Sequence, residues 1–121
     1  MRLIFLLLVL SIPGTIYANP IDCFKTAMAD RQITEGLNSV GVMHLCSRAT
    51  STAPVECYKI GIADKEITNN LTSVGVMHLC SGATSTDRID CFKAGLADKE
   101  ITKNLTSVGI THLCGTEKNS K

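Results

Sequence analysis

The chain has 121 residues, of which 45% are hydrophobic and only 4% aromatic, and its formal net charge is +1 at pH 7. It contains no tryptophan, and its lysines and arginines do not form a run. A charge this close to zero, with no aromatic platform for base stacking, argues against nucleic acid as a partner, and it gives no electrostatic reason to expect binding to an anionic membrane.

Residues 1–18 have the pattern of a secretory signal peptide. Arg2 supplies a positive charge, the segment 3–12 is apolar, and Pro13 precedes a cleavage site after Ala18. The apolar segment has ten residues, whereas a transmembrane helix needs about 20. We therefore expect an exported protein, periplasmic or extracellular, with no transmembrane segment after removal of the signal peptide.

The rest of the chain is built from tandem repeats of 34 residues. The repeats cover residues 19–52, 53–86 and 87–121, the last with a short tail. Two cysteines recur in every repeat: Cys23, Cys57 and Cys91 at the first position, and Cys46, Cys80 and Cys114 at the second. A fixed period of this length is typical of helical repeat arrays, in which each unit packs on its neighbours. We expect one continuous array.

The first part of each repeat predicts a helix, which the second repeat illustrates. Glu56 stands just before the first cysteine, where an acidic residue favours a helix N-terminus. The charged stretch 64–66 ends this helix. One helical face, by spacing, consists of Cys57, Tyr58, Gly61 and Ile62. The other repeats place their equivalents on the same face: Cys23, Phe24, Ala27 and Met28, and Cys91, Phe92, Gly95 and Leu96.

A second helix follows after a short turn. Thr68 is the expected N-cap, as are Thr34 and Thr102 in the other repeats. The tract SGATST, residues 81–86, ends the helix and forms a loop. Two helices joined by a short turn run antiparallel and form a hairpin. The expected core-facing stripe of the second helix consists of Leu71, Val74, Gly75, His78 and Leu79.

Antiparallel packing brings the two cysteines of a repeat to the same end of the hairpin. Six cysteines in an exported chain favour disulfides over free thiols. Each bond would close a loop of about 24 residues and contribute roughly 3 kcal/mol. We expect an all-α tandem array of αα-hairpins, each stapled by one disulfide. The expected pairs are Cys23–Cys46, Cys57–Cys80 and Cys91–Cys114.

The third repeat departs from the others at one informative position. Met43 and Met77 are replaced there by Thr111. If this position packs on the following repeat, a polar residue suits the last unit, because terminal repeats have no neighbour to cover them. We expect Met43 and Met77 to lie in repeat interfaces and Thr111 to be exposed.

A histidine stands two residues before the second cysteine of each repeat, as His44, His78 and His112. Residues two apart on a helix point in different directions, so His and Cys of one repeat cannot hold one metal ion or form a nucleophile pair. We expect partly buried, hydrogen-bonded histidines, with a pH-sensitive contact as the alternative. We assign no catalytic, cofactor-binding or metal-ligating residue, and we do not expect an enzyme.

Asn70 and Asn104 begin N-glycosylation sequons, which matter only in a eukaryotic secretory pathway.

The segments LCSGATS (79–85) and PVECYK (54–59) resemble those of exported bacterial tandem-repeat proteins that carry L-C-S-G-A-T-S and P-V-x-C-Y/F-K. The resemblance covers the whole mature chain and implies export and a helical fold, but it brings no activity and no site residues. In architecture the chain is also similar to Sel1-like and tetratricopeptide-type αα repeats.

These observations favour a secreted or periplasmic structural or interaction protein. It would bind a protein, peptide or envelope component along its helical surface, as stacked helical repeats do. Two alternatives stay open. One is a metal-binding or redox-sensing protein that uses reduced cysteines and histidines, and the other is a secreted hydrolase or inhibitor. The sequence identifies neither the partner nor the oligomeric state.

Overall fold

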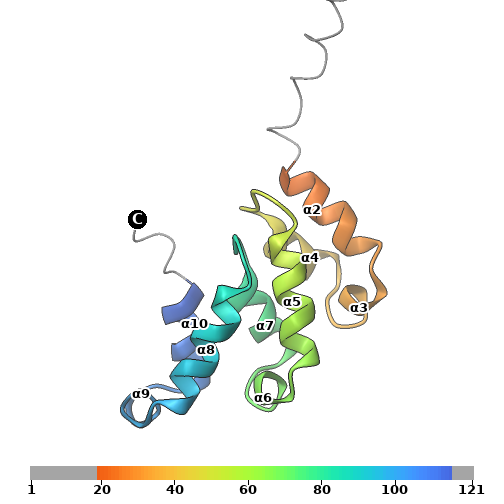
Figure 1. The fold of residues 1–121 in the computed structure, drawn as a ribbon. Coiled ribbons are helices and arrows are strands. Elements are labelled where there is room, and N and C mark those ends of the chain that lie inside the picture. Colours follow the sequence, from red (N-terminus) through yellow and green to blue (C-terminus); the bar gives the residue numbers. More distant parts are fainter. Residues whose placement is uncertain (1–18, 116–121) are drawn as a thin grey trace, which may run out of the picture.

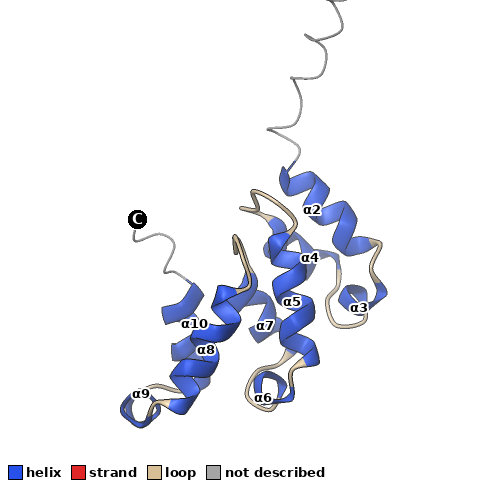
Figure 2. Ribbon diagram, viewed as in Figure 1, coloured by secondary structure: helices blue, strands red, loops and turns tan. Residues whose placement is uncertain are grey.

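The computed structural model describes residues 19–115, so the expected signal peptide lies outside the described residues. The regular secondary structure of this part of the chain is entirely helical, with loops between the helices, which confirms the all-α prediction (Figures 1 and 2). Each repeat has three helices rather than two. They are α2 (Asn19–Met28), α3 (Arg31–Thr34) and α4 (Ser39–Cys46); α5 (Ala53–Ala63), α6 (Lys65–Thr68) and α7 (Ser73–Cys80); and α8 (Asp87–Ala97), α9 (Lys99–Asn104) and α10 (Ser107–Gly115).

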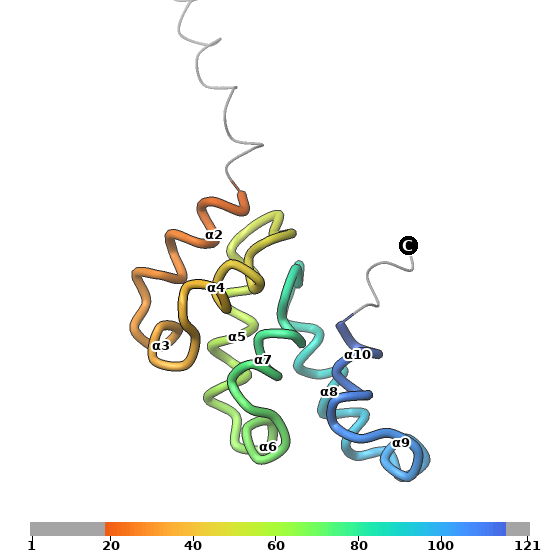
Figure 3. Tube along the Cα trace, turned by 180° about the vertical axis from the view of Figure 1, so that it is seen from behind, coloured from red at the N-terminus to blue at the C-terminus, as the bar shows by residue number. Residues whose placement is uncertain are grey.

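The helices form two rows that follow the order of the repeats. In each repeat the first helix packs on the last one, so that α2 contacts α4, α5 contacts α7 and α8 contacts α10. Between repeats, α2 contacts α5 and α5 contacts α8 in one row, while α4 contacts α7 and α7 contacts α10 in the other. Figure 1 shows the first row in front, and Figure 3 shows the second row from behind. The predicted array of hairpins is therefore confirmed.

The short middle helix was not predicted, and it displaces the start of the last helix. The Asp64 carboxylate accepts a hydrogen bond from the Glu66 N–H (2.9 Å) and caps α6. The Thr72 hydroxyl then accepts from the Gly75 N–H (3.2 Å) and caps α7. The expected N-caps Thr34, Thr68 and Thr102 are wrong, because each lies inside a short helix.

Burial confirms the predicted face of the first helix but not that of the last. Cys57, Tyr58 and Gly61 are buried and Ile62 is half-buried, as expected, but Met28, the equivalent of Ile62 in the first repeat, is exposed. On α7, however, Val74 and His78 are exposed, and the buried residues are Val76, Met77, Leu79 and Cys80. The disulfide holds Cys80 on the buried face, and Val76 lies one turn before it on the same face. The face with Val74 and His78 therefore points outward.

The position that distinguishes the third repeat faces the preceding repeat, not the following one. Met77 is buried as predicted, but Met43 is exposed and Thr111 is buried. The predictions for Met43 and Thr111 are wrong for the same reason, because this position packs on the preceding repeat. Among the described residues the first repeat has no preceding repeat, so Met43 is uncovered, whereas the second repeat covers Thr111. The Thr111 hydroxyl donates to the Ser107 carbonyl (3.0 Å), which satisfies it inside the interface.

The three disulfides have the predicted pairing. They join Cys23 to Cys46, Cys57 to Cys80 and Cys91 to Cys114, with Cα–Cα distances of 5.6, 5.6 and 5.8 Å. Each bond ties the first helix of a repeat to the end of its last helix.

The connection after α7 has two features that fix its path. Gly82 has a positive φ of 71°, which favours glycine and ends the helix as the sequence predicts. The buried Arg88 guanidinium at the start of α8 donates to the carbonyls of Leu79 (3.2 Å) and Ser81 (2.6 Å). The first two repeats have Pro20 and Pro54 at the position of Arg88. The repeat pattern therefore did not indicate that this position would bind the end of the preceding helix.

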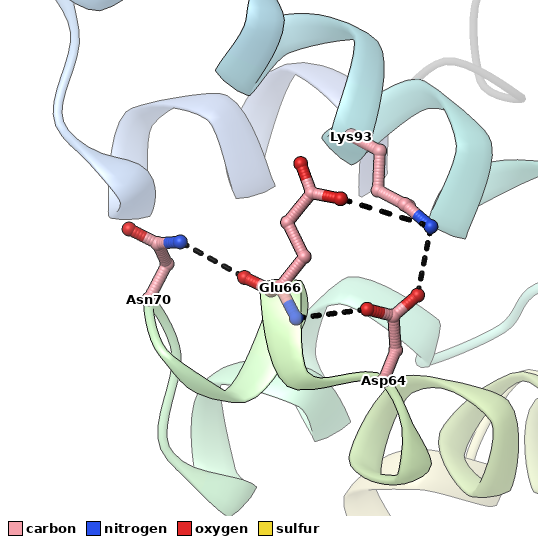
Figure 4. A network of polar contacts seen from close by, with 4 residues as sticks. All are labelled: Asp64, Glu66, Asn70 and Lys93. Atoms are coloured by element: carbon pink, nitrogen blue, oxygen red, sulfur yellow. Dashed lines mark hydrogen bonds and ion pairs between the residues drawn. The ribbon is translucent and has the colours of Figure 1, made fainter.

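Adjacent repeats are also joined by ion pairs at equivalent positions. Lys59 Nζ lies 2.8 Å from Asp30 Oδ2, and Lys93 Nζ lies 2.8 Å from Asp64 Oδ2. Figure 4 shows the second pair, in which Lys93 also reaches Glu66 Oε1 at 3.8 Å. The hydrogen bond from each lysine lowers the pKa of its aspartate and raises the pKa of the lysine itself.

Tyr58 is a buried aromatic residue between the first two repeats. Its hydroxyl has no hydrogen-bond partner of good geometry. Burial raises the pKa of this phenol, and the nearby Ser73 hydroxyl opposes the change only in part. Phenylalanine occupies the same position in the other repeats, as Phe24 and Phe92.

We expect Tyr58→Phe to leave the thermal stability unchanged or to raise it, because removing a buried hydroxyl without a good partner loses no hydrogen bond. Thermal unfolding of the oxidised protein, followed by circular dichroism, measures this. Tyr58→Ala is the matched control and should cost about 3–5 kcal/mol through the cavity that it leaves. A marked loss of stability in Tyr58→Phe would show that the hydroxyl makes a stabilising bond with Ser73.

Because of these ion pairs, we expect the free energy of unfolding to decrease at acidic pH. Because the aspartate pKa is lowered by folding, the stabilisation is fully present above the ordinary value of 3.8 and is lost as the pH falls through the lowered value. The double variant Lys59→Met/Lys93→Met should therefore show a smaller fall in melting temperature than the wild type between about pH 4 and about pH 2. Lys65→Met/Lys99→Met changes two exposed lysines outside these pairs and should retain the wild-type profile. Equal slopes in all three proteins would contradict the prediction.

Candidate functional site

The structure places the cysteines and histidines apart. All six cysteines of the chain are in disulfides, so none is available as a thiolate for metal binding or redox chemistry. Among residues 19–115, no group of three His, Cys, Asp or Glu side chains could hold a metal ion. The prediction of partly buried histidines is wrong, because His44, His78 and His112 are all exposed.

The sequon residues have local structural roles. The Asn70 side chain donates to the Glu66 carbonyl (2.9 Å) at the end of α6, and Thr72 caps the start of α7. Asn104 and Thr106 make the same contacts in the third repeat. The motif therefore ends one helix and begins the next. Both asparagines are exposed, and their glycosylation stays a prediction.

Exposed apolar and imidazole side chains recur along the row of last helices. In each repeat a valine and a histidine stand four residues apart on one helical face, and both are exposed. We call this set the Val/His row. It consists of Val40 and His44 on α4, Val74 and His78 on α7, and Val108 and His112 on α10. The spacing of Val74 and His78 predicted that they lie in the core, whereas both are exposed.

Part of the Val/His row borders a groove of about 400 Å³ beside α7 and α10. We call this cavity the α7–α10 groove. Its apolar lining includes Leu71 and Val108, and its polar lining includes Arg48, His78, Ser81 and His112. Arg48 comes from the loop after α4, so two neighbouring repeats and the end of a third contribute to the cavity.

The residues that line the α7–α10 groove carry charge of one sign only. Arg48 carries a permanent positive charge, while none of the residues that line this cavity is an aspartate or a glutamate. The His78 imidazole adds a hydrogen-bonding group, whereas the Ser81 hydroxyl already donates to the His44 carbonyl (2.7 Å). A groove with apolar walls and donors at its rim suits a ligand that combines apolar groups with carboxylates. The sequence could not reveal this site for two reasons. The second repeat has Gly82 at the position of Arg48, so the repeat pattern does not mark this residue, and Arg48 lies beside the same cavity as His78 and His112 only after folding.

The helices of residues 19–115 are all too short or too polar to cross a lipid bilayer. No protein-family model, no curated protein and no solved structure matches the chain. The geometry of the α7–α10 groove and of the Val/His row is therefore the basis for a functional proposal.

Proposed function

We propose that this protein is an exported interaction module that binds an extended acidic peptide segment of another protein in the α7–α10 groove. The observation that carries the proposal is the lining of this cavity. Val108 and Leu71 provide apolar contacts, and Arg48 provides a charged donor, with no carboxylate among the lining residues to repel an anion.

The Val/His row extends the same chemistry beyond the groove. The exposed faces of α4, α7 and α10 repeat one apolar and one hydrogen-bonding side chain at each step of the array. An extended segment that crosses the three helices would meet equivalent contacts in succession, as in other helical repeat proteins. Several weak equivalent contacts on one chain add to the overall affinity.

The disulfides support a place for this function in an oxidising compartment. Disulfides persist in secreted and periplasmic proteins and are rare in the cytosol. The pairing of all six cysteines is compatible with such a compartment. It also disfavours the metal-binding or redox-sensing alternative, which needs reduced cysteines. The hydrolase or inhibitor alternative gains no specific support from the groove.

The oxidised protein should enrich peptides that contain both acidic and apolar residues from a phage-displayed random 12-residue library. Synthetic peptides of the enriched sequence, labelled with a fluorophore, then report affinity by anisotropy. Arg48→Glu should raise the dissociation constant by at least about tenfold, because it places a negative charge against the ligand carboxylates. Val108→Asp should have a similar effect.

Val40→Asp is the matched control, because Val40 belongs to the Val/His row but lies outside the groove. It should change the affinity less than Val108→Asp. Enrichment of peptides without acidic residues, or equal binding by wild type and Arg48→Glu, would refute the proposal.

A further inference from the structure

Each repeat has two faces that can pack on a neighbour, and we call them the start face and the end face. The start face contacts the preceding repeat. Val55 on α5 and Ile89 on α8 belong to it and are 2% and 4% exposed, whereas Ile21, at the same position of α2, is 60% exposed. A hollow of about 220 Å³, bordered by Ile21, Phe24 and Met43, lies on the uncovered start face of the first repeat.

The end face contacts the following repeat, and it is uncovered in the third repeat. Leu45 and Leu79 are fully buried, whereas Leu113, at the same position of α10, is 54% exposed. Ile101 and Leu105 are only half-buried, although their equivalents in the first two repeats are buried. The described array thus presents one apolar face at each of its two ends.

The polar contacts between repeats are incomplete at the same two ends. Lys59 and Lys93 pair with the aspartate of the preceding repeat, and Lys25 is the equivalent lysine of the first repeat. Asp98 is the equivalent aspartate of the third repeat. Within residues 19–115, no ion pair includes either Lys25 or Asp98.

The end face of the third repeat is already arranged for such a partner. Asp98 Oδ1 caps α9 by accepting from the Glu100 N–H at 2.9 Å, just as Asp64 Oδ1 caps α6. The other carboxylate oxygen of Asp64, Oδ2, forms the ion pair with Lys93. A side chain at Gly61 would first meet Val76 of its own repeat (2.7 Å) and then Ile89 of the next repeat (3.2 Å), whereas at Gly95 the three nearest atoms all belong to Ile110 of its own repeat.

We propose that the start face of one molecule binds the end face of a second copy of the same chain, so that molecules associate head to tail. Lys25 of one copy would pair with Asp98 of the next, and Ile21 would pack beside Gly95. The new interface would repeat the contacts that already join the repeats inside the chain.

A second copy fits these faces better than a symmetric dimer would. Two start faces offer no Asp98 to pair with Lys25, and two end faces offer no Lys25 to pair with Asp98, so a symmetric dimer would form neither ion pair. A head-to-tail interface uses two different faces, so it produces open chains or closed rings rather than a single dimer. This proposal does not depend on peptide binding in the α7–α10 groove.

Sedimentation velocity of the purified, oxidised protein over a wide concentration range tests the proposal. The wild type should form a concentration-dependent series of oligomers. Ile21→Asp and Leu113→Asp should each raise the dissociation constant by at least about tenfold, because each places a charge in the apolar contact. Both residues are exposed in the single molecule, so the variants should still fold, and circular dichroism and intact mass verify this. Ile60→Asp is the matched control and should associate like the wild type, because Ile60 is exposed on α5 in the middle repeat and lies outside the Val/His row and both end faces.

A charge exchange identifies which faces meet. Lys25→Glu alone and Asp98→Lys alone should each weaken association, because each variant brings like charges together. An equimolar mixture of the two variants should recover the association. Every contact between one variant and the other then joins opposite charges at positions 25 and 98. A wild type that stays monomeric, a single symmetric dimer, or equal loss of association in Ile60→Asp would overturn the proposal. Mixtures no more associated than the separate variants would also contradict the Lys25–Asp98 contact.

Discussion

The disulfide within each repeat is the constraint on which the rest of the structure depends. A repeat of 34 residues has too few apolar side chains to bury a core of its own. The bond between the first helix and the end of the last helix fixes their relative position. It also sets the rotation of the last helix, because its second cysteine must face inward. The burial of Val76 and the exposure of Val74 both follow from that rotation.

Neighbouring repeats supply the burial that a single repeat cannot. Leu79 is fully buried, whereas Leu113, in an almost identical sequence, is half exposed. The difference comes from the following repeat, which covers one residue and not the other. The same reasoning explains Met43 and Met77. Each described repeat is therefore stabilised by the neighbours that it has, and the ion pairs and Arg88 add polar contacts at the same interfaces.

The surfaces that remain uncovered divide into two kinds, and they suggest two kinds of partner. The Val/His row is exposed in every repeat, so no packing within the array accounts for its apolar residues. The two end faces are uncovered only where the described array stops, and their equivalents are covered elsewhere. A surface of the first kind suits a different molecule that runs along the helices. A surface of the second kind suits another copy of the array.

The sequence by itself determined the repeat period, the helical class, the pairing of the cysteines and the buried face of the first helix. These features depend on spacing along the chain, which a repeat pattern records directly. The tertiary structure alone decided the rotation of the last helix, the direction in which the Met43 position packs, and the assembly of Arg48 with the histidines in one groove. Each of these depends on which neighbour covers a residue, and near-identical repeats have the same sequence signal whatever covers them. The middle helix was missed for a local reason. Asp64 and Thr72 cap two successive helices, α6 and α7. The apolar residues across these two helices are spaced like those of a single helix, so the break between the helices left no signal in the apolar pattern.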